Sequence, residues 1–172
     1  ALVPAPTDGF QALQLAPAPL PVPLPGKTTL VSLAGPVQER THLAGAARVD
    51  VSAHMEAGEN GHVAAFLYDG DALVTWGMFN LAHREGHHKH VSAKPGDMLR
   101  FSIPLLPTEH VFEPGSEMRL ELRGAHVTDW TAVRPTQPSE VGLHGGPDGM
   151  ALVLPTVPPE SATPAPAALD WS

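Results

Sequence analysis

The stretch from Ala72 to Leu122 constrains the fold most, because apolar and polar residues alternate along it and Pro-Gly dipeptides interrupt the alternation. The clearest case is Glu117–Arg123, where Met118, Leu120 and Leu122 alternate with charged side chains. Successive side chains of a strand point to opposite faces, so this pattern predicts a strand with one face in the core and the other in solvent. No apolar stripe with a 3.6-residue period is sustained, so helices are expected to be short or absent.

Comparable patterns recur along the chain. His62–Asp69 carries apolar residues on both faces and is expected in the centre of a sheet. The Asp-Gly-Asp sequence after it predicts a hairpin to the following strand, whereas Pro104 predicts that its own strand ends there or lies at an edge. Met150–Leu154 is expected to stop at Pro155. The predicted strands are Thr28–Leu33, Ala47–Ala53, His62–Asp69, Leu73–Leu81, Leu99–Leu105, Glu117–Arg123, His126–Trp130 and Met150–Leu154.

These strands, spaced about ten residues apart, predict an all-β fold: a two-sheet jelly-roll sandwich of the galactose-binding-domain type. Residues 131–147 are expected to form a loop, because prolines and glycines are frequent there. Of the 20 prolines, twelve lie in the two ends of the chain. Since proline cannot donate a backbone hydrogen bond, we predict a Pro-rich leader or linker over 1–26, the sandwich over 27–155 and a Pro-rich tail over 156–172.

The overall charge argues against nucleic acid as a partner. Ten Lys and Arg stand against eighteen Asp and Glu, for a net charge of −8, and no basic stripe is present. No apolar run approaches the roughly 20 residues that a membrane-spanning helix needs, so a soluble chain without a membrane span is predicted. The first residues lack the pattern of a signal peptide. With no cysteine, the compartment stays open between cytoplasm and secretion in a bacterial-type cell.

No catalytic residue and no cofactor are predicted from the motifs. The G-x-S-x-G sequence of a serine hydrolase elbow is missing, and a serine without an oriented base is a poor nucleophile. A structural role is therefore expected for the serines that we considered, which are Ser32, Ser92, Ser102, Ser116 and Ser139.

A histidine-rich segment over 83–90 is the densest cluster of titratable groups. Imidazole nitrogens are good zinc or nickel ligands, so His83, His87, His88 and His90 are weak candidates for a metal site. The positive charges of Arg84 and Lys89 oppose a bound cation, and a solvated loop without metal is favoured. Arg84 and Glu85 are expected to pin this loop as an ion pair or to face a partner domain.

Two further groups of residues have a structural and a binding interpretation. Trp76, Phe79, Phe101 and Phe112 are expected to fill the core rather than to form a sugar-stacking platform, whereas Trp130 is expected in a rim loop at a domain interface. Glu109, Glu113 and Glu117 are expected to form a solvated rim rather than a calcium site, because calcium needs several convergent oxygens.

An ordered set of short motifs runs through the predicted strands and turns: Gly45, Tyr68-Asp69, Gly77, Arg84-Glu85, Pro95-Gly96, Leu105–Thr108, His110–Phe112, Gly115 and Arg119-Leu120. In the order of these motifs the chain resembles, over roughly Gly35 to Leu154, the C-terminal β-sandwich domain of X-prolyl dipeptidyl peptidases and related cocaine-esterase-like serine hydrolases. It departs from the family pattern at Ser116-Glu117 and over Gly124–Trp130.

The resemblance implies that catalysis belongs to an α/β-hydrolase domain, upstream in the same chain or supplied in trans, with a serine nucleophile and Asp and His partners. This chain would then be a non-catalytic accessory domain that packs on the hydrolase domain and shapes substrate access. The alternative is a free-standing sandwich that binds carbohydrate or another protein, and self-association to a homo-oligomer also stays open.

Overall fold

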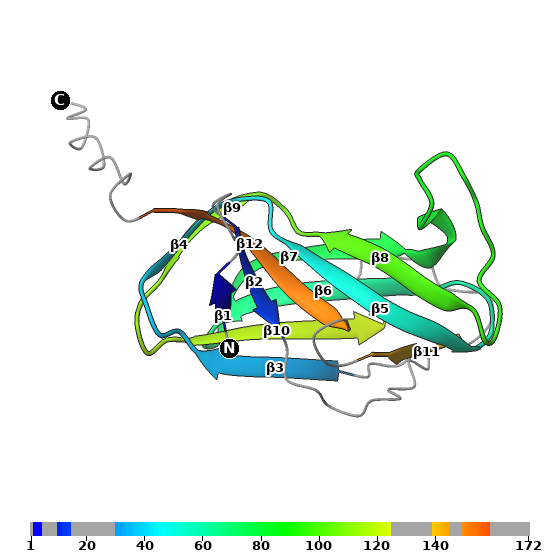
Figure 1. Ribbon diagram of the computed structural model, residues 1–172, viewed down its shortest axis with the longest axis horizontal. Helices are drawn as coiled ribbons and strands as arrows, with labels where there is room; N and C mark the ends of the chain where they lie inside the picture. Colours follow the sequence, from blue (N-terminus) through cyan, green and yellow to red (C-terminus); the bar gives the residue numbers. More distant parts are fainter. Residues whose placement is uncertain (1, 5–9, 15–29, 125–138, 145–148, 159–172) are drawn as a thin grey trace.

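Two antiparallel sheets face each other in the computed structural model of the chain, which describes residues 2–4, 10–14, 30–124, 139–144 and 149–158 (Figure 1). The all-β sandwich that the alternating pattern predicts is confirmed. One 3-10 turn, η1 (Leu81–His83), interrupts the strands of this part. None of the described segments forms a helix of the length and apolarity that crossing a bilayer requires.

The smaller sheet has four strands in the order β3 (Leu30–Pro36), β10 (Glu117–Gly124), β6 (His62–Asp69) and β7 (Ala72–Asn80). β6 pairs with β10 on one side and with β7 on the other, which confirms its predicted central position. The hairpin between β6 and β7 is also confirmed, with Asp69 opposite Ala72. Gly70 adopts a positive φ of 56° in this turn, a conformation that glycine reaches without steric cost.

The larger sheet has β5 (Arg48–Ala57) near its middle. β5 pairs with β8 (Met98–Pro104) along one edge and with β11 (Glu140–Leu143) and β12 (Met150–Val157) along the other. β8 ends at Pro104, as predicted. The remaining strands extend this sheet and are β1 (Leu2–Pro4), β2 (Phe10–Gln14), β4 (Thr41–Gly45) and β9 (Thr108–Phe112).

Apolar side chains from both sheets fill the space between them. Ala47, Val49, Val51 and Ala53 are all buried, as their alternation predicts. On the facing sheet, Met118, Leu120 and Leu122 are buried on the predicted inward side of β10. Because two facing layers remove these side chains from water, their burial supplies the main favourable free energy of the fold.

The loop that follows β8 crosses the free edge of β7. The backbone N–H of Leu106 donates to the carbonyl of Trp76 at 2.9 Å, and the Thr75 hydroxyl donates to the carbonyl of Leu106 at 2.7 Å. These bonds satisfy backbone groups that an edge strand otherwise leaves open to other chains. They also bring the backbone of Pro104 close to Gly77.

Several strands differ from the expectation. β4, β9 and β11 are additional strands, and β11 lies within the segment expected to be a loop. The expectation that Pro155 ends the last strand is wrong, because β12 continues to Val157. Proline has no backbone N–H, so a strand tolerates it only at a position where no inter-strand hydrogen bond requires that donor.

The leader was expected to lack regular pairing, but β1 and β2 lie in it, and β2 pairs with β12. The strand expected over His126–Trp130 lies outside the described residues. The domain boundaries at residues 26 and 155 stay predictions.

Candidate functional site

Two of the serines considered above donate hydrogen bonds to oxygen acceptors rather than to an imidazole. Ser102 donates to the Asp50 carboxylate, and Ser139 donates to the backbone carbonyl of Glu59 at 3.2 Å. The Ser116 hydroxyl is buried and has no hydrogen-bond partner within the described part of the chain. Ser92 is partly exposed, and the side chain of Ser32 lies outside the described set. A carboxylate or carbonyl acceptor alone does not build the nucleophile, base and orienting acid of a catalytic triad.

The histidine-rich loop is not gathered around one point. Within the described ranges, no group of three or more His, Cys, Asp or Glu side chains is arranged to hold a metal ion. His83 lies in η1, and its ring meets the His90 ring edge to face with 6.1 Å between centroids. His87 and His88 are exposed. The arrangement therefore offers no ligand set of the kind that zinc or nickel needs.

The Arg84 side chain anchors the histidine-rich loop by binding backbone carbonyl groups. Its guanidinium donates to the carbonyls of Leu81 at 3.1 Å, Val91 at 2.6 Å and Ser92 at 3.2 Å. Glu85 pairs with Lys89 instead of Arg84, and the hydrogen bond from Lys89 lowers the pKa of the Glu85 carboxyl. Arg84 thus pins the loop, but not through the expected ion pair. The interface role of Arg84 and Glu85 stays a prediction, and Trp130 lies outside the described residues.

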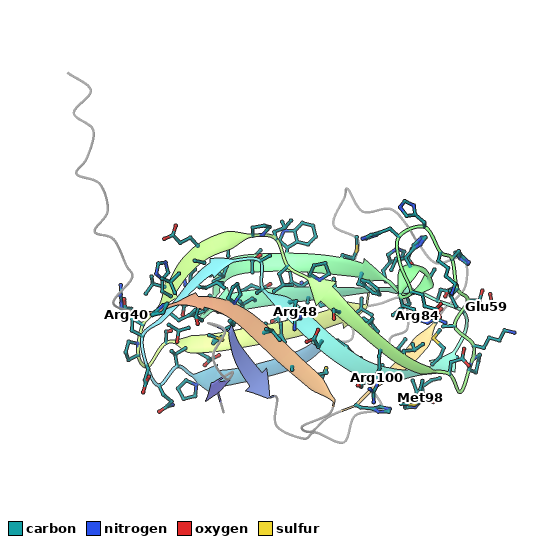
Figure 2. All side chains as sticks on the ribbon, turned by 45° about the horizontal axis from the view of Figure 1, so that its top comes forward. Arg40, Arg48, Glu59, Arg84, Met98 and Arg100 are labelled. Carbon is teal, nitrogen blue, oxygen red and sulfur yellow. The ribbon has the colours of Figure 1, made fainter. Side chains whose placement is uncertain are left out.

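A groove of about 760 Å³ opens between this loop and the outer face of the larger sheet. Arg84 and Arg100 lie at the same end of the molecule as the loop (Figure 2). Asp50 also lines the groove, where it pairs with Arg48 at 3.1 Å. The groove therefore carries charges of both signs, and the Ser102 hydroxyl that lines it donates to the Asp50 carboxylate rather than to an imidazole.

The three glutamates considered as a calcium site do not converge. Glu109 pairs with His42 at 3.0 Å, and Glu113 pairs with Arg40 at 3.2 Å. Both carboxylates are exposed. They form rim contacts of the sandwich, where surface ion pairs contribute little stability.

His62 and His83 are two titratable residues that lie close to each other. Burial lowers the pKa of His62, and the nearby His83 lowers it further. Nδ1 of each ring is buried without a hydrogen-bond partner among the described residues. Because the folded state disfavours the protonated form, the unfolded chain takes up this proton more readily.

The stability that a neutral His62 contributes is therefore complete above its ordinary pKa of 6.5 and decreases as the pH falls through that value. We expect the midpoint of thermal unfolding to drop between about pH 7.5 and 5.5, and to drop less in a His62→Gln variant. His88 is exposed and gives the control: a His88→Gln variant should show the same dependence of the unfolding midpoint on pH as the parent protein. Equal slopes for the parent and the His62→Gln variant would contradict this prediction.

The outer face of the four-stranded sheet carries the most unusual set of side chains. Because Leu67 and Leu120 are buried and face the core, their strand neighbours point outward. We call this surface the aromatic–arginine face. Its members are Phe66 and Tyr68 of β6, Leu73, Trp76 and Met78 of β7, and Arg119, Glu121 and Arg123 of β10.

Glu121 is the centre of this face. The sequence predicted a solvated side chain, but the residue is only 2% exposed. Arg119 donates to one carboxylate oxygen and Arg123 to the other. The guanidinium groups lie over the Tyr68 and Phe66 rings, each 4.5 Å from the ring centroid, and so help to cover the carboxylate. Alternation alone could not reveal this burial, because the Phe66 and Tyr68 rings under the two guanidinium groups come from the neighbouring strand β6.

Of the four aromatic residues expected in the core, two are buried there, one is partly buried against it and one is not in it. Phe112 and Phe101 are buried in the core, and Phe79 is partly buried against it. Trp76 instead lies on the aromatic–arginine face, where its ring stacks with Phe66 at 6.3 Å between centroids. The signal available in the sequence was the register of the hairpin, which places these two residues opposite each other.

Comparison with known proteins identifies relatives of this sandwich. The family described as the X-Pro dipeptidyl-peptidase C-terminal non-catalytic domain matches residues 25–153. A search of curated proteins gives no significant match.

Three solved structures share the fold at low sequence identity. A CocE/NonD family hydrolase from Staphylococcus aureus has a TM-score of 0.63 at 16% identity, over 74% of this chain and 30% of its own. An aminopeptidase from a marine sediment Thaumarchaeota archaeon has a TM-score of 0.62 at 15% identity, over 77% of this chain and 26% of the aminopeptidase chain. An α-amino acid ester hydrolase has a TM-score of 0.62 at 16% identity, over 89% of this chain and 33% of the hydrolase chain. This chain thus spans a third or less of each of these proteins.

Proposed function

Because this chain belongs to the family of the X-Pro dipeptidyl-peptidase C-terminal non-catalytic domain, we propose that it is the accessory module of a CocE/NonD-type serine hydrolase. The α/β-hydrolase domain that carries the catalytic serine would lie upstream in the same protein or act in trans. In this role the sandwich packs on the hydrolase domain and shapes the access of substrate. Bond cleavage itself belongs to the partner domain.

The observation that carries the proposal is the family match over nearly all of the sandwich. Two features of the structure support it. The aromatic–arginine face presents aromatic and arginine side chains, which are enriched at protein interfaces. The solved relatives also contain two to three times as much chain outside the shared fold as within it.

The activity test compares three samples: this chain, the purified α/β-hydrolase domain encoded with it, and the two together. The substrates are Ala-Pro-p-nitroanilide and a short acyl ester. We expect no turnover by the chain alone, and a change in KM or substrate preference of the hydrolase when the chain is present. Turnover by the chain alone, or a hydrolase domain whose kinetics are identical with and without it, would refute the proposal.

The alternative function is a free-standing module that binds carbohydrate. The outward position of Trp76 beside Phe66 is the observation that favours it, because sugar rings stack on exposed aromatic side chains. Calorimetric titration with a panel of oligosaccharides separates the two functions. Saturable heat that disappears in a Trp76→Ala variant with an unchanged fold would support sugar binding, whereas an accessory hydrolase domain should give no heat.

A further inference from the structure

The segment between β7 and β8, which contains the histidine-rich loop, is fastened beside His62. The N–H of Leu81 donates to the carbonyl of Gly61 at 2.9 Å, and the N–H of Ala93 donates to the side-chain oxygen of Asn60 at 3.0 Å. Both acceptors come directly before His62, the first residue of β6. The two ends of this segment are therefore held next to the same histidine.

Between these ends the loop buries little apolar surface and projects from one end of the sandwich (Figure 1). All residues over 85–90 are exposed, and Val91 and Ser92 are partly buried. The N–H of Val91 bonds to the carbonyl of Ala82 at 2.8 Å, and the Arg84 guanidinium binds carbonyls on both sides of the loop. A segment with few apolar contacts opens at a lower free energy than core strands do. The loop can therefore detach while both sheets stay folded.

Two histidine rings at this place accommodate a positive charge poorly. Nδ1 of His62 and Nδ1 of His83 are buried and have no hydrogen-bond partner among the described residues. Arg84 follows with a permanent positive charge, and the His90 ring meets the His83 ring edge to face. Burial is the larger cause of the lowered pKa of His62, and His83 is the second. Since hydration of the His62 ring weakens both causes, opening of the loop takes up a proton.

The carboxylates around the two rings have other partners or are exposed. Asn80, opposite His62 in β7, is uncharged. On the groove side, Arg100 adds a positive charge and His87 is exposed. The carboxylates are Asp50, which pairs with Arg48, Glu85, which pairs with Lys89, and Glu59 of the turn before β6, which is exposed. Protonation of both histidines therefore adds like charges that water stabilises better once the loop is open.

We propose that the histidine-rich loop is an acid-operated wall of the groove that it forms with the larger sheet. When His62 and His83 take up protons, the loop detaches from Ala82 while the two sheets stay paired. Detachment removes His83, Arg84 and His87 from the groove and leaves its sheet side, with Asp50, open to water. This inference is independent of the proposed function, since it concerns a property of this chain alone.

Native-state hydrogen exchange of the full chain measures this opening at single amides. The Val91 N–H reports the loop, and the Leu120 N–H of β10, a strand paired on both sides, reports the sandwich. With His62 neutral in the closed loop and titrating near 6.5 in the open one, opening becomes about tenfold more favourable from about pH 7.5 to 5.5. We expect the protection of Val91, corrected for the pH dependence of intrinsic exchange, to fall by that factor. Low urea should leave the opening at Val91 unchanged and promote that at Leu120, since only the latter exposes much surface.

His62→Gln removes the buried titratable ring, and His88→Gln is the matched control because His88 is exposed. We expect the pH dependence of Val91 protection to be largely lost in His62→Gln and to persist in His88→Gln, with Leu120 protection showing that each variant is folded. Val91 protection that is equal at the two pH values in the parent chain would overturn the inference. An opening at Val91 with the urea dependence of Leu120, or an equal pH dependence in the parent and in His62→Gln, would overturn it as well.

Discussion

A Gly77→Ala substitution is expected to remove about 3–5 kcal/mol of folding free energy, a large part of what a domain of this size has. A Cβ atom at Gly77 would lie 1.9 Å from the carbonyl oxygen of Pro104 and 3.1 Å from the Cα of Leu105. The neighbouring atoms belong to the backbone and cannot rotate away. One of the two crossing segments would have to move, with loss of the hydrogen bonds that Leu106 makes to β7.

Gly35→Ala is the matched control for this experiment. Gly35 lies in β3 of the same sheet, and a Cβ atom there would meet nothing within 4 Å. Urea unfolding should give a much lower midpoint for Gly77→Ala and a midpoint close to the parent for Gly35→Ala. If both variants unfolded at the parent midpoint, the close crossing of β7 by the end of β8 would be wrong.

Replacement of both Arg119 and Arg123 by methionine is expected to cost about 3 kcal/mol, because it leaves the Glu121 carboxylate buried without a counter-charge. Each arginine binds one of the two carboxylate oxygens. The arginine side chains are 24% and 30% exposed, so water screens them in part, and we expect the lower end of the range for a broken buried pair. Methionine keeps much of the apolar volume over Tyr68 and Phe66.

Adding Glu121→Met to the double variant should restore most of the lost stability, since no buried charge then remains. Chemical denaturation of the parent, the double and the triple variants measures this difference. A triple variant that is as unstable as the double variant would show that the arginines act through packing on the aromatic rings instead of through the carboxylate. The single variants should each lose less than the double, because one guanidinium remains on Glu121.

The alternation of apolar residues was enough to predict which side chains of β5, β8 and β10 face the core. Val49 and Val51 of β5 and Leu120 of β10 are buried where the period of two places them, because that period follows from backbone geometry alone. The missed strands β4 and β9 pair with each other through polar residues such as Thr41, His42 and Glu109, so the hydrophobic signal is weak there. Their pairing depends on contacts between segments more than sixty residues apart, as between His42 and Glu109.

The candidate metal and interface residues show that side chains clustered in the sequence need not cluster in space. His83 to His90 are neighbours in sequence, yet the loop turns His87 and His88 outward and directs the donors of Arg84 to its own carbonyls. The aromatic–arginine face, in contrast, joins residues of β6, β7 and β10 that no local pattern connects. Local order in the sequence and proximity in space are separate properties of a sheet protein.

The class of fold and the inward side chains of the alternating strands follow from the sequence, because both depend on a two-residue repeat and on turn residues that act locally. The need for glycine at position 77, the burial of Glu121 and the outward position of Trp76 follow only from the three-dimensional arrangement of the strands. The physical reason is that each of these facts depends on the register between strands, which brings atoms from distant parts of the chain within a few ångströms.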